Sequence, residues 1–158
     1  MPTTCTRCWS NSWLIFTISV YDFSVKRQQI APKKVYAIDT GLINSVGFAF
    51  SPNPGRLLKN LVFLALRRQT REVYYFTSPT GSEVDFYLPE SHTLIQVSQS
   101  LAQPATRERE VRALTDALRA LGLDHGLILT DSSAEPIVDR GMTIEIRSLP
   151  VWLLQATL

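Results

Sequence analysis

The sequence predicts an α/β domain in which a mixed β-sheet is flanked by helices. Two stretches place apolar residues at helical spacing, and three short stretches between them are rich in β-branched and aromatic residues. From residue 56 onward these segments follow one another in the order α-β-β-β-α-β. The chain has 158 residues, of which 45% are hydrophobic and 19% charged, so it can build the core of a single domain.

The N-terminal part is expected to begin with a poorly ordered or disordered segment, residues 1–12. Within it Cys5 and Cys8 form a lone CxxC, which lacks the four ligands of a structural zinc site. The apolar run 13–20 is too short to span a bilayer, and no small-residue cleavage site of a signal peptide follows it. Its β-branched and aromatic content predicts a strand.

Three further segments complete this N-terminal extension. Residues 24–34 are interpreted as a basic connector that contains Pro32. Residues 35–39 (VYAID) predict a short strand, and residues 51–55 (SPNPG) have the composition of a turn.

The core is expected to open with a helix over residues 56–69, where apolar residues recur densely at helical spacing. Residues 72–78 and 83–88 then predict a β-hairpin around the turn Pro79-Thr80-Gly81-Ser82. Residues 93–99 predict a third strand.

The second half is expected to contain a long amphipathic helix over residues 105–121, ended by Gly122. Two buried strands at 126–130 and 142–147 and a helical turn at 149–156 should follow. The whole is interpreted as one domain, residues 13–158, made of an extension (13–50), a core (55–131) and a C-terminal strand and helix (132–158).

Four separated motifs carry a resemblance to a known family. They are KKVYAIDTGLIN (33–44), GRLLKNLVFLALRR (55–68), GSEVDFYL (81–88) and LIQVSQS (94–100). In this order they resemble the domain of unknown function that follows the ATPase core in a family of prokaryotic AAA-type ATPases. The resemblance runs from about residue 13 to the C-terminal PVWLL and implies a restriction-endonuclease-like, PD-(D/E)xK-type fold.

The same resemblance implies an ATPase core that this sequence does not contain. The phosphate-binding motif GxxxxGK[ST] occurs nowhere in the chain. The chain is therefore expected to be a truncated product, an excised domain or a free-standing remnant, and ATP hydrolysis by it is not expected.

A nuclease of the implied fold needs acids that converge on Mg²⁺ and a lysine near the attacking water. The family pattern places these groups at Lys59, Asp85, Gln96 and Ser98, and only Asp85 keeps the required chemistry. Glu83 lies on the same strand face as Asp85, because side chains alternate along a strand. We therefore expect no catalytic residues, no metal site and no cofactor, with Mg²⁺ relevant only if a residual site were active.

The acids Glu83 and Asp85 have two interpretations. In the first, Lys59 forms an ion pair with Asp85 in place of a metal. In the second, Glu83 and Asp85 are the solvated face of a hairpin. A nuclease with a migrated site would need another acid near Asp85, and Glu72 and Glu90 are the nearest candidates in sequence.

Charge is distributed unevenly along the chain, although the net charge is only +2. Residues 1–71 carry a net charge of +8 and residues 72–158 carry −6. Nine basic residues are therefore candidates for phosphate contacts: Lys26, Arg27, Lys33, Lys34, Arg56, Lys59, Arg67, Arg68 and Arg71.

The favoured function is a non-catalytic regulatory or protein-interaction module that docks onto an ATPase core, another protein or a second copy. The alternative is a DNA-binding module without cleavage, and a metal-dependent nuclease is the third possibility. Tyr74, Tyr75 and Phe76 are expected in the core of a strand rather than stacked on bases. No membrane partner is expected, and the cysteine usage favours a cytoplasmic setting.

Overall fold

The computed structural model describes residues 14–41 and 54–156. Cys5 and Cys8, the expected disorder of residues 1–12 and most of the expected turn at 51–55 lie outside the described residues. Within those two ranges, none of the helices combines the length and apolar character needed to cross a membrane.

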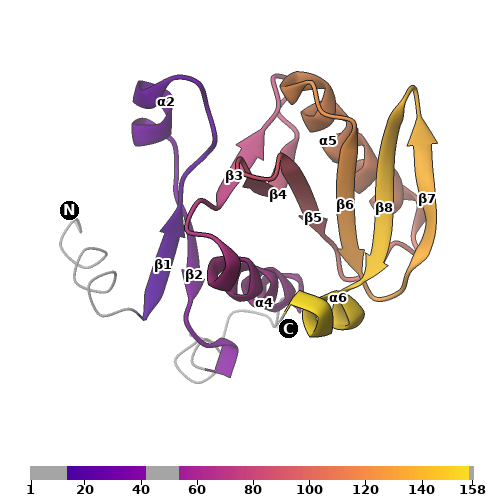
Figure 1. Ribbon diagram of the computed structural model, residues 1–158, viewed down its shortest axis with the longest axis horizontal. Helices are drawn as coiled ribbons and strands as arrows, with labels where there is room; N and C mark the ends of the chain where they lie inside the picture. The colour runs from indigo at the N-terminus through magenta and orange to yellow at the C-terminus, as the bar shows by residue number, and fades with distance from the viewer. Residues whose placement is uncertain (1–13, 42–53, 157–158) are drawn as a thin grey trace.

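A six-stranded mixed sheet forms the body of the protein (Figure 1). Its order is β3-β4-β5-β6-β8-β7, with antiparallel pairs β3–β4, β4–β5 and β7–β8 and parallel pairs β5–β6 and β6–β8. The strands are β3 (Tyr74–Thr77), β4 (Glu83–Leu88), β5 (Thr93–Val97), β6 (His125–Thr130), β7 (Ala134–Asp139) and β8 (Met142–Ser148).

Helices cover both faces of this sheet. On one face α5 (Pro104–Leu121) packs Leu114 and Leu118 against Leu94 and Ile128. On the other face lie α4 (Pro54–Gln69) and α6 (Leu149–Ala156), whose side chains pack with Ile95 and other apolar residues of the sheet. The expected α/β class, with helices on both faces of a mixed sheet, is therefore confirmed.

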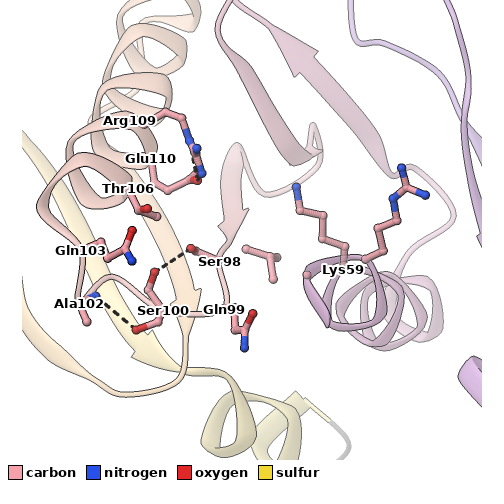
Figure 2. Close-up of a pocket in the computed structure, with 12 residues that line it drawn as sticks. Lys59, Ser98, Gln99, Ser100, Ala102, Gln103, Thr106, Arg109 and Glu110 are labelled. Carbon is pink, nitrogen blue, oxygen red and sulfur yellow. Dashed lines mark hydrogen bonds and ion pairs between the residues drawn. The ribbon is translucent and has the colours of Figure 1, made fainter. Parts of the chain in front are cut away.

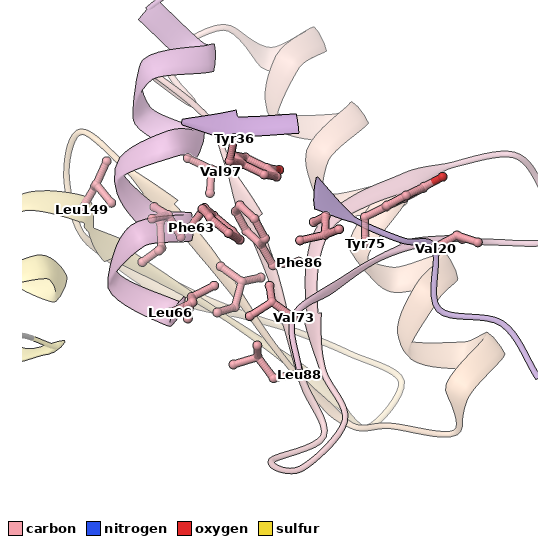
Figure 3. Packing of buried hydrophobic residues seen from close by; sticks show 14 residues of the cluster. Val20, Tyr36, Phe63, Leu66, Val73, Tyr75, Phe86, Leu88, Val97 and Leu149 are labelled. Atoms are coloured by element: carbon pink, nitrogen blue, oxygen red, sulfur yellow. The ribbon is translucent and has the colours of Figure 1, made fainter. Parts of the chain in front are cut away.

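The N-terminal residues form a separate two-stranded antiparallel sheet, β1 (Ile15–Ile18) and β2 (Lys34–Ala37). Tyr36 of β2 stacks on Phe63 of α4 with ring centroids 4.4 Å apart, and Figure 3 shows both rings beside Phe86. The side chain of Asn60 on α4 accepts a hydrogen bond from the Ala37 N–H at 2.8 Å and donates one to the Ala37 carbonyl at 3.0 Å. Apolar packing and a buried amide thus join this hairpin to the core.

The turn and cap expectations are confirmed. Gly81 has a φ of 87° in the β3–β4 turn, where the Ser78 N–H donates to the Ser82 carbonyl at 2.8 Å. Gly122 adopts a left-handed conformation with a φ of 66° and ends α5. Glycine tolerates this region because it has no Cβ.

Two elements differ from the sequence-based expectations. The interpretation of residues 24–34 as a connector was wrong in part, because these residues contain the short helix α2 (Val25–Ile30). Ser24 caps the helix, and its hydroxyl accepts from the Arg27 N–H at 3.4 Å. No strand was expected at β7, which is exposed and contains Pro136. Pairing with β8 at the edge of the sheet creates β7, and an edge tolerates proline.

Candidate functional site

The site begins where β4 and β5 separate. The last residue pair of their ladder is Phe86 with Ile95. Past this pair the two strands are joined by hydrogen bonds from main-chain N–H groups to side chains instead of main-chain carbonyls. The Asp85 N–H donates to Gln96 Oε1 at 3.0 Å, and the Val97 N–H donates to Asp85 Oδ2 at 3.0 Å. Asp85 and Gln96 are 2% and 5% exposed, so both are held in one orientation inside the protein.

Two lysines neutralise the buried Asp85 carboxylate. Lys59 Nζ of α4 lies 2.5 Å from Asp85 Oδ1, and Lys34 Nζ of β2 lies 3.7 Å from the same oxygen. Lys34 also contacts Glu83 Oε1 at 2.8 Å. The expected Lys59–Asp85 ion pair is confirmed, whereas the second lysine was expected only as a phosphate contact. A buried carboxylate needs such partners, because an uncompensated one costs several kcal/mol.

The alternative in which both acids form a solvated face is wrong for Asp85, which is buried, and right only for the exposed Glu83.

The Tyr36 hydroxyl lies close enough to Asp85 and Glu83 for their charges to shift its pKa. Burial raises the pKa of the Tyr36 hydroxyl far above its ordinary value of 10.0, and the negative charges of Asp85 and Glu83 raise it further. This hydroxyl is therefore protonated at neutral pH.

Behind Asp85 the structure places an acid, Glu110, that was not among the residues predicted from the sequence. Gln96 Nε2 donates to Glu110 Oε2 of α5 at 2.5 Å. Arg109 donates to the other oxygen of Glu110 from Nη2 at 2.6 Å and from Nε at 3.2 Å. This hydrogen bond and the Glu110 charge raise the pKa of Arg109.

A signal for Glu110 does exist in the sequence. Glu110 precedes Ala113 by three residues and Leu114 by four, so it belongs to the apolar stripe that α5 turns toward the sheet. A charged residue in such a stripe is a candidate for a buried, partnered group. Glu72 and Glu90, the candidates for a migrated nuclease site, make no contact with Asp85 among those found in the described residues. Glu90 instead accepts from the Thr70 hydroxyl at 2.7 Å.

Ser98, the last of the four positions compared with a nuclease in the sequence, follows β5 directly. Its hydroxyl donates to the Ser100 carbonyl at 3.2 Å, and its N–H donates to the Leu129 carbonyl at 3.0 Å. Ser98 is 8% exposed. Its hydroxyl thus orders the loop after β5 and supplies no cation where a nuclease would place one.

Two open hollows flank Lys59 and Arg56. The first, the hairpin-side hollow, has a volume of about 700 Å³ and is lined by residues of β2, α4 and β4, including Lys34 and Asp85. The second, the α5-side hollow, has a volume of about 610 Å³ and lies between α4, the loop after β5 and the start of α5. Figure 2 shows Lys59 on one wall of this second hollow and Gln103, Thr106 and Arg109 on the other.

The donor set around Asp85 does not fit Mg²⁺, the ion that the implied fold would use. Mg²⁺ needs oxygen ligands in octahedral geometry. Here Lys59 and the Val97 N–H occupy the two Asp85 oxygens, and both oxygens of Glu110 are bonded as well. Over residues 14–41 and 54–156 no group of three His, Cys, Asp or Glu side chains is arranged to hold a metal.

The candidate phosphate-contacting residues form two groups rather than one continuous face. Lys34, Arg56 and Lys59 border the hollows near Asp85. A separate hollow of about 420 Å³ at the other end of α4 is lined by Arg67, Arg68 and Arg71. Arg56 and Arg67 are about 17 Å apart along the helix axis. Of the others, Arg27 pairs with Asp22 at 3.2 Å, and Lys26 and Lys33 are exposed.

The expectation for the three aromatic residues of β3 is confirmed for two of them. Tyr75 and Phe76 are buried, and the Tyr75 hydroxyl donates to the Pro32 carbonyl at 2.6 Å. Tyr74 is half-buried and meets Tyr21 edge-on with ring centroids 5.8 Å apart. These rings are committed to contacts within the protein.

Comparison with known proteins finds one similar sequence of note. No protein-family model matches the chain, and no solved structure matches it. An uncharacterized protein of Methanocaldococcus jannaschii is 36% identical over 154 residues. This match covers 91% of the present chain and 33% of the archaeal protein, so the chain spans about one third of the length of the curated relative it matches.

Proposed function

We propose that this chain is a non-catalytic nuclease-like module that acts through protein contacts as part of an AAA-type ATPase system. The observation that carries the proposal is the contact of Lys59 with the buried Asp85. In the family pattern position 59 is an acid that would share a metal with Asp85. A lysine there supplies the positive charge that a metal would bring and competes with a metal for the Asp85 carboxylate.

The arrangement around Asp85 supports a restriction-endonuclease-like origin. The acid lies on the second strand of an α-β-β-β-α-β series. The next strand carries Gln96 at the acid position, and Ser98, at the lysine position, follows that strand directly. All three polar groups now make internal hydrogen bonds. The polar site is therefore retained as structure while its metal chemistry is absent.

Docking onto an ATPase core, another protein or a second copy would use the N-terminal region. Helix α2 buries none of its residues, and Phe23 and Ile30 are 85% and 74% exposed. Val35 of β2 and Ile38, which follows β2, are also exposed. Exposed apolar side chains of this size favour a protein contact. The greater length of the archaeal relative is consistent with such a larger context. The proposed module would act in the cytoplasm and without a cofactor.

The proposal is tested by calorimetric titration of the protein with Mg²⁺ and Mn²⁺, together with incubation of labelled DNA and RNA. We expect no saturable metal binding and no cleavage by the natural sequence. The Lys59→Glu variant provides the comparison, because it removes the competing cation and should acquire measurable affinity for the metal. Saturable metal binding or cleavage by the natural sequence would refute the non-catalytic assignment.

A second function, DNA binding without cleavage, is favoured by the position of Arg56 and Lys59 on the ridge between the two hollows. Both are cationic and reach the surface, as phosphate contacts must. A titration of labelled single- and double-stranded DNA at low and moderate salt tests it. Binding that weakens with salt and does not depend on Mg²⁺ supports this function, and no binding at low salt excludes it.

A further inference from the structure

The α5-side hollow combines the features of an anion site. Three cationic side chains line it, Arg56, Lys59 and Arg109, against a single acid, Glu110. Both oxygens of that acid are already bonded, one to Gln96 and the other to Arg109. The lining residues thus carry a net charge of two positive units; Arg109 compensates the charge of Glu110, and Lys59 is paired with Asp85 of the neighbouring hollow.

Two of the three cations of this hollow, Arg56 and Arg109, keep donors available to a ligand, and the third, Lys59, is paired with Asp85. Arg56 is exposed and forms no ion pair with any residue of the described chain. The Arg109 side chain is 66% exposed and uses only Nε and one terminal nitrogen on Glu110. Lys59 lines both hollows, and Asp85 would keep Lys34 as a partner if Lys59 turned toward an anion.

Neutral donors complete the opposite wall, which Figure 2 shows across from Lys59. The Gln99 and Gln103 amides and the Thr106 hydroxyl line the hollow and make no side-chain hydrogen bond within the described chain. The hollow contains no aromatic residue on which a base could stack. Its chemistry therefore selects a charged oxygen-rich group rather than a nucleobase.

We propose that the α5-side hollow binds a phosphate monoester dianion through Arg56, Lys59 and Arg109. The net charge of the lining matches a dianion better than the single charge of a phosphodiester, and arginine suits phosphate because its donors form a planar fork. A volume of about 610 Å³ admits the phosphate with part of the molecule that carries it. This inference goes beyond the proposed docking function and does not depend on it.

Inorganic phosphate is the first probe, titrated by calorimetry into the whole chain at pH 8 and at constant ionic strength set with chloride. A phosphate monoester is a dianion at that pH, because its second pKa is about 6. We expect saturable binding. Arg56→Gln should weaken it about tenfold through the loss of one charge-assisted contact.

Arg68→Gln is the matched control, because it removes the same charge from the same helix at a residue that lines a different hollow. It should leave the affinity unchanged. Equal weakening by both variants would show a diffuse charge effect and overturn the proposal, as would the absence of saturable phosphate binding.

A second titration identifies the source of the phosphate. Two short single-stranded oligonucleotides, identical except for a 5′-phosphate or a 5′-hydroxyl, are compared. Tighter binding of the phosphorylated strand, weakened by Arg56→Gln, assigns the hollow to a strand end. Equal binding of the two strands, with saturable binding of inorganic phosphate, assigns it to a small phosphorylated molecule. The metal titration described above is independent, so either proposal can fail without the other.

Discussion

Gln96 Nε2 donates to Glu110 Oε2 at 2.5 Å, and so the amide at position 96 satisfies a carboxylate that is only 6% exposed. An acid at position 96, which the family pattern for a nuclease requires, would place a second carboxylate against Glu110. The neutral side chain at 96 and the buried acid on α5 are therefore coupled. An acidic side chain at position 96 would therefore destabilise the protein.

Gln96→Glu tests this coupling. We expect a loss of about 3 kcal/mol in the free energy of unfolding at pH 8, because two buried carboxylates cannot both ionise at this separation. In the variant the two carboxyl groups are stable together only while they share a proton, so the variant should be most stable at low pH and lose stability as the pH rises. At pH 5 the free energy of unfolding of the variant should therefore approach that of the natural protein. Urea unfolding at the two pH values measures the effect.

Gln99→Glu is the control for this experiment, because Gln99 is exposed and makes no hydrogen bond to Glu110. It should change the free energy of unfolding by less than about 0.5 kcal/mol. A Gln96→Glu variant as stable as this control at pH 8 would contradict the coupling.

The two lysines at Asp85 should be partly redundant. Lys59→Met or Lys34→Met alone leaves one ammonium near the carboxylate, and each should cost less than about 2 kcal/mol. The double variant leaves a buried carboxylate uncompensated and should cost more than the sum of the two single changes. A double-mutant cycle by urea unfolding measures this, and strict additivity would show that the lysines act independently.

Asn60→Leu should loosen the N-terminal hairpin. The change removes two hydrogen bonds and leaves the buried main-chain groups of Ala37 without partners, at a cost of about 2–3 kcal/mol. Hydrogen exchange should accelerate in β1 and β2 more than in β4, β5 and β6. Gln69→Leu, on the exposed end of the same helix, is the comparison and should leave the hairpin protected. Uniform acceleration across the six-stranded sheet would disprove a local role.

Stability should fall at alkaline pH through Tyr36. Its pKa is raised above 10.0 by burial first and by Asp85 and Glu83 second. A raised pKa means that the stabilising contribution is fully present below the unfolded value and is lost as the pH rises beyond about 10 toward the folded value. Tyr36→Phe should flatten the decline of the urea midpoint between pH 9 and 11. An unchanged slope would assign the alkaline loss to other groups, among them Tyr75 and Tyr87, whose pKa values are raised mainly by burial.

The exposed apolar residues of the N-terminal region predict association. Light scattering coupled to size exclusion should detect self-association if the docking partner is a second copy. Val35→Lys should abolish it without loss of stability, because Val35 is 56% exposed. Val138→Lys, on the exposed edge strand β7, is the matched control at 70% exposure. A dimer insensitive to Val35→Lys but lost in Val138→Lys would move the interface to β7.

The sequence alone determined the class of the fold and most of the helices and strands. The periodicity of residues 56–69 and 105–121, and the turn residues Gly81 and Gly122, are local signals that tertiary contacts did not override. The positions Lys59 and Asp85 could be paired in advance only because a family pattern assigned both to one site.

Only the tertiary structure decided which other groups reach that site. Glu110 and Lys34 lie far from Asp85 in sequence, and the packing of α5 on the sheet and of the hairpin on α4 brings them near it. Strand β7 likewise forms because β8 offers unpaired main-chain groups at its edge. The residues of β7, which include Pro136, did not predict a strand by themselves. Local signals specify elements, whereas docking between elements specifies which charges are buried together.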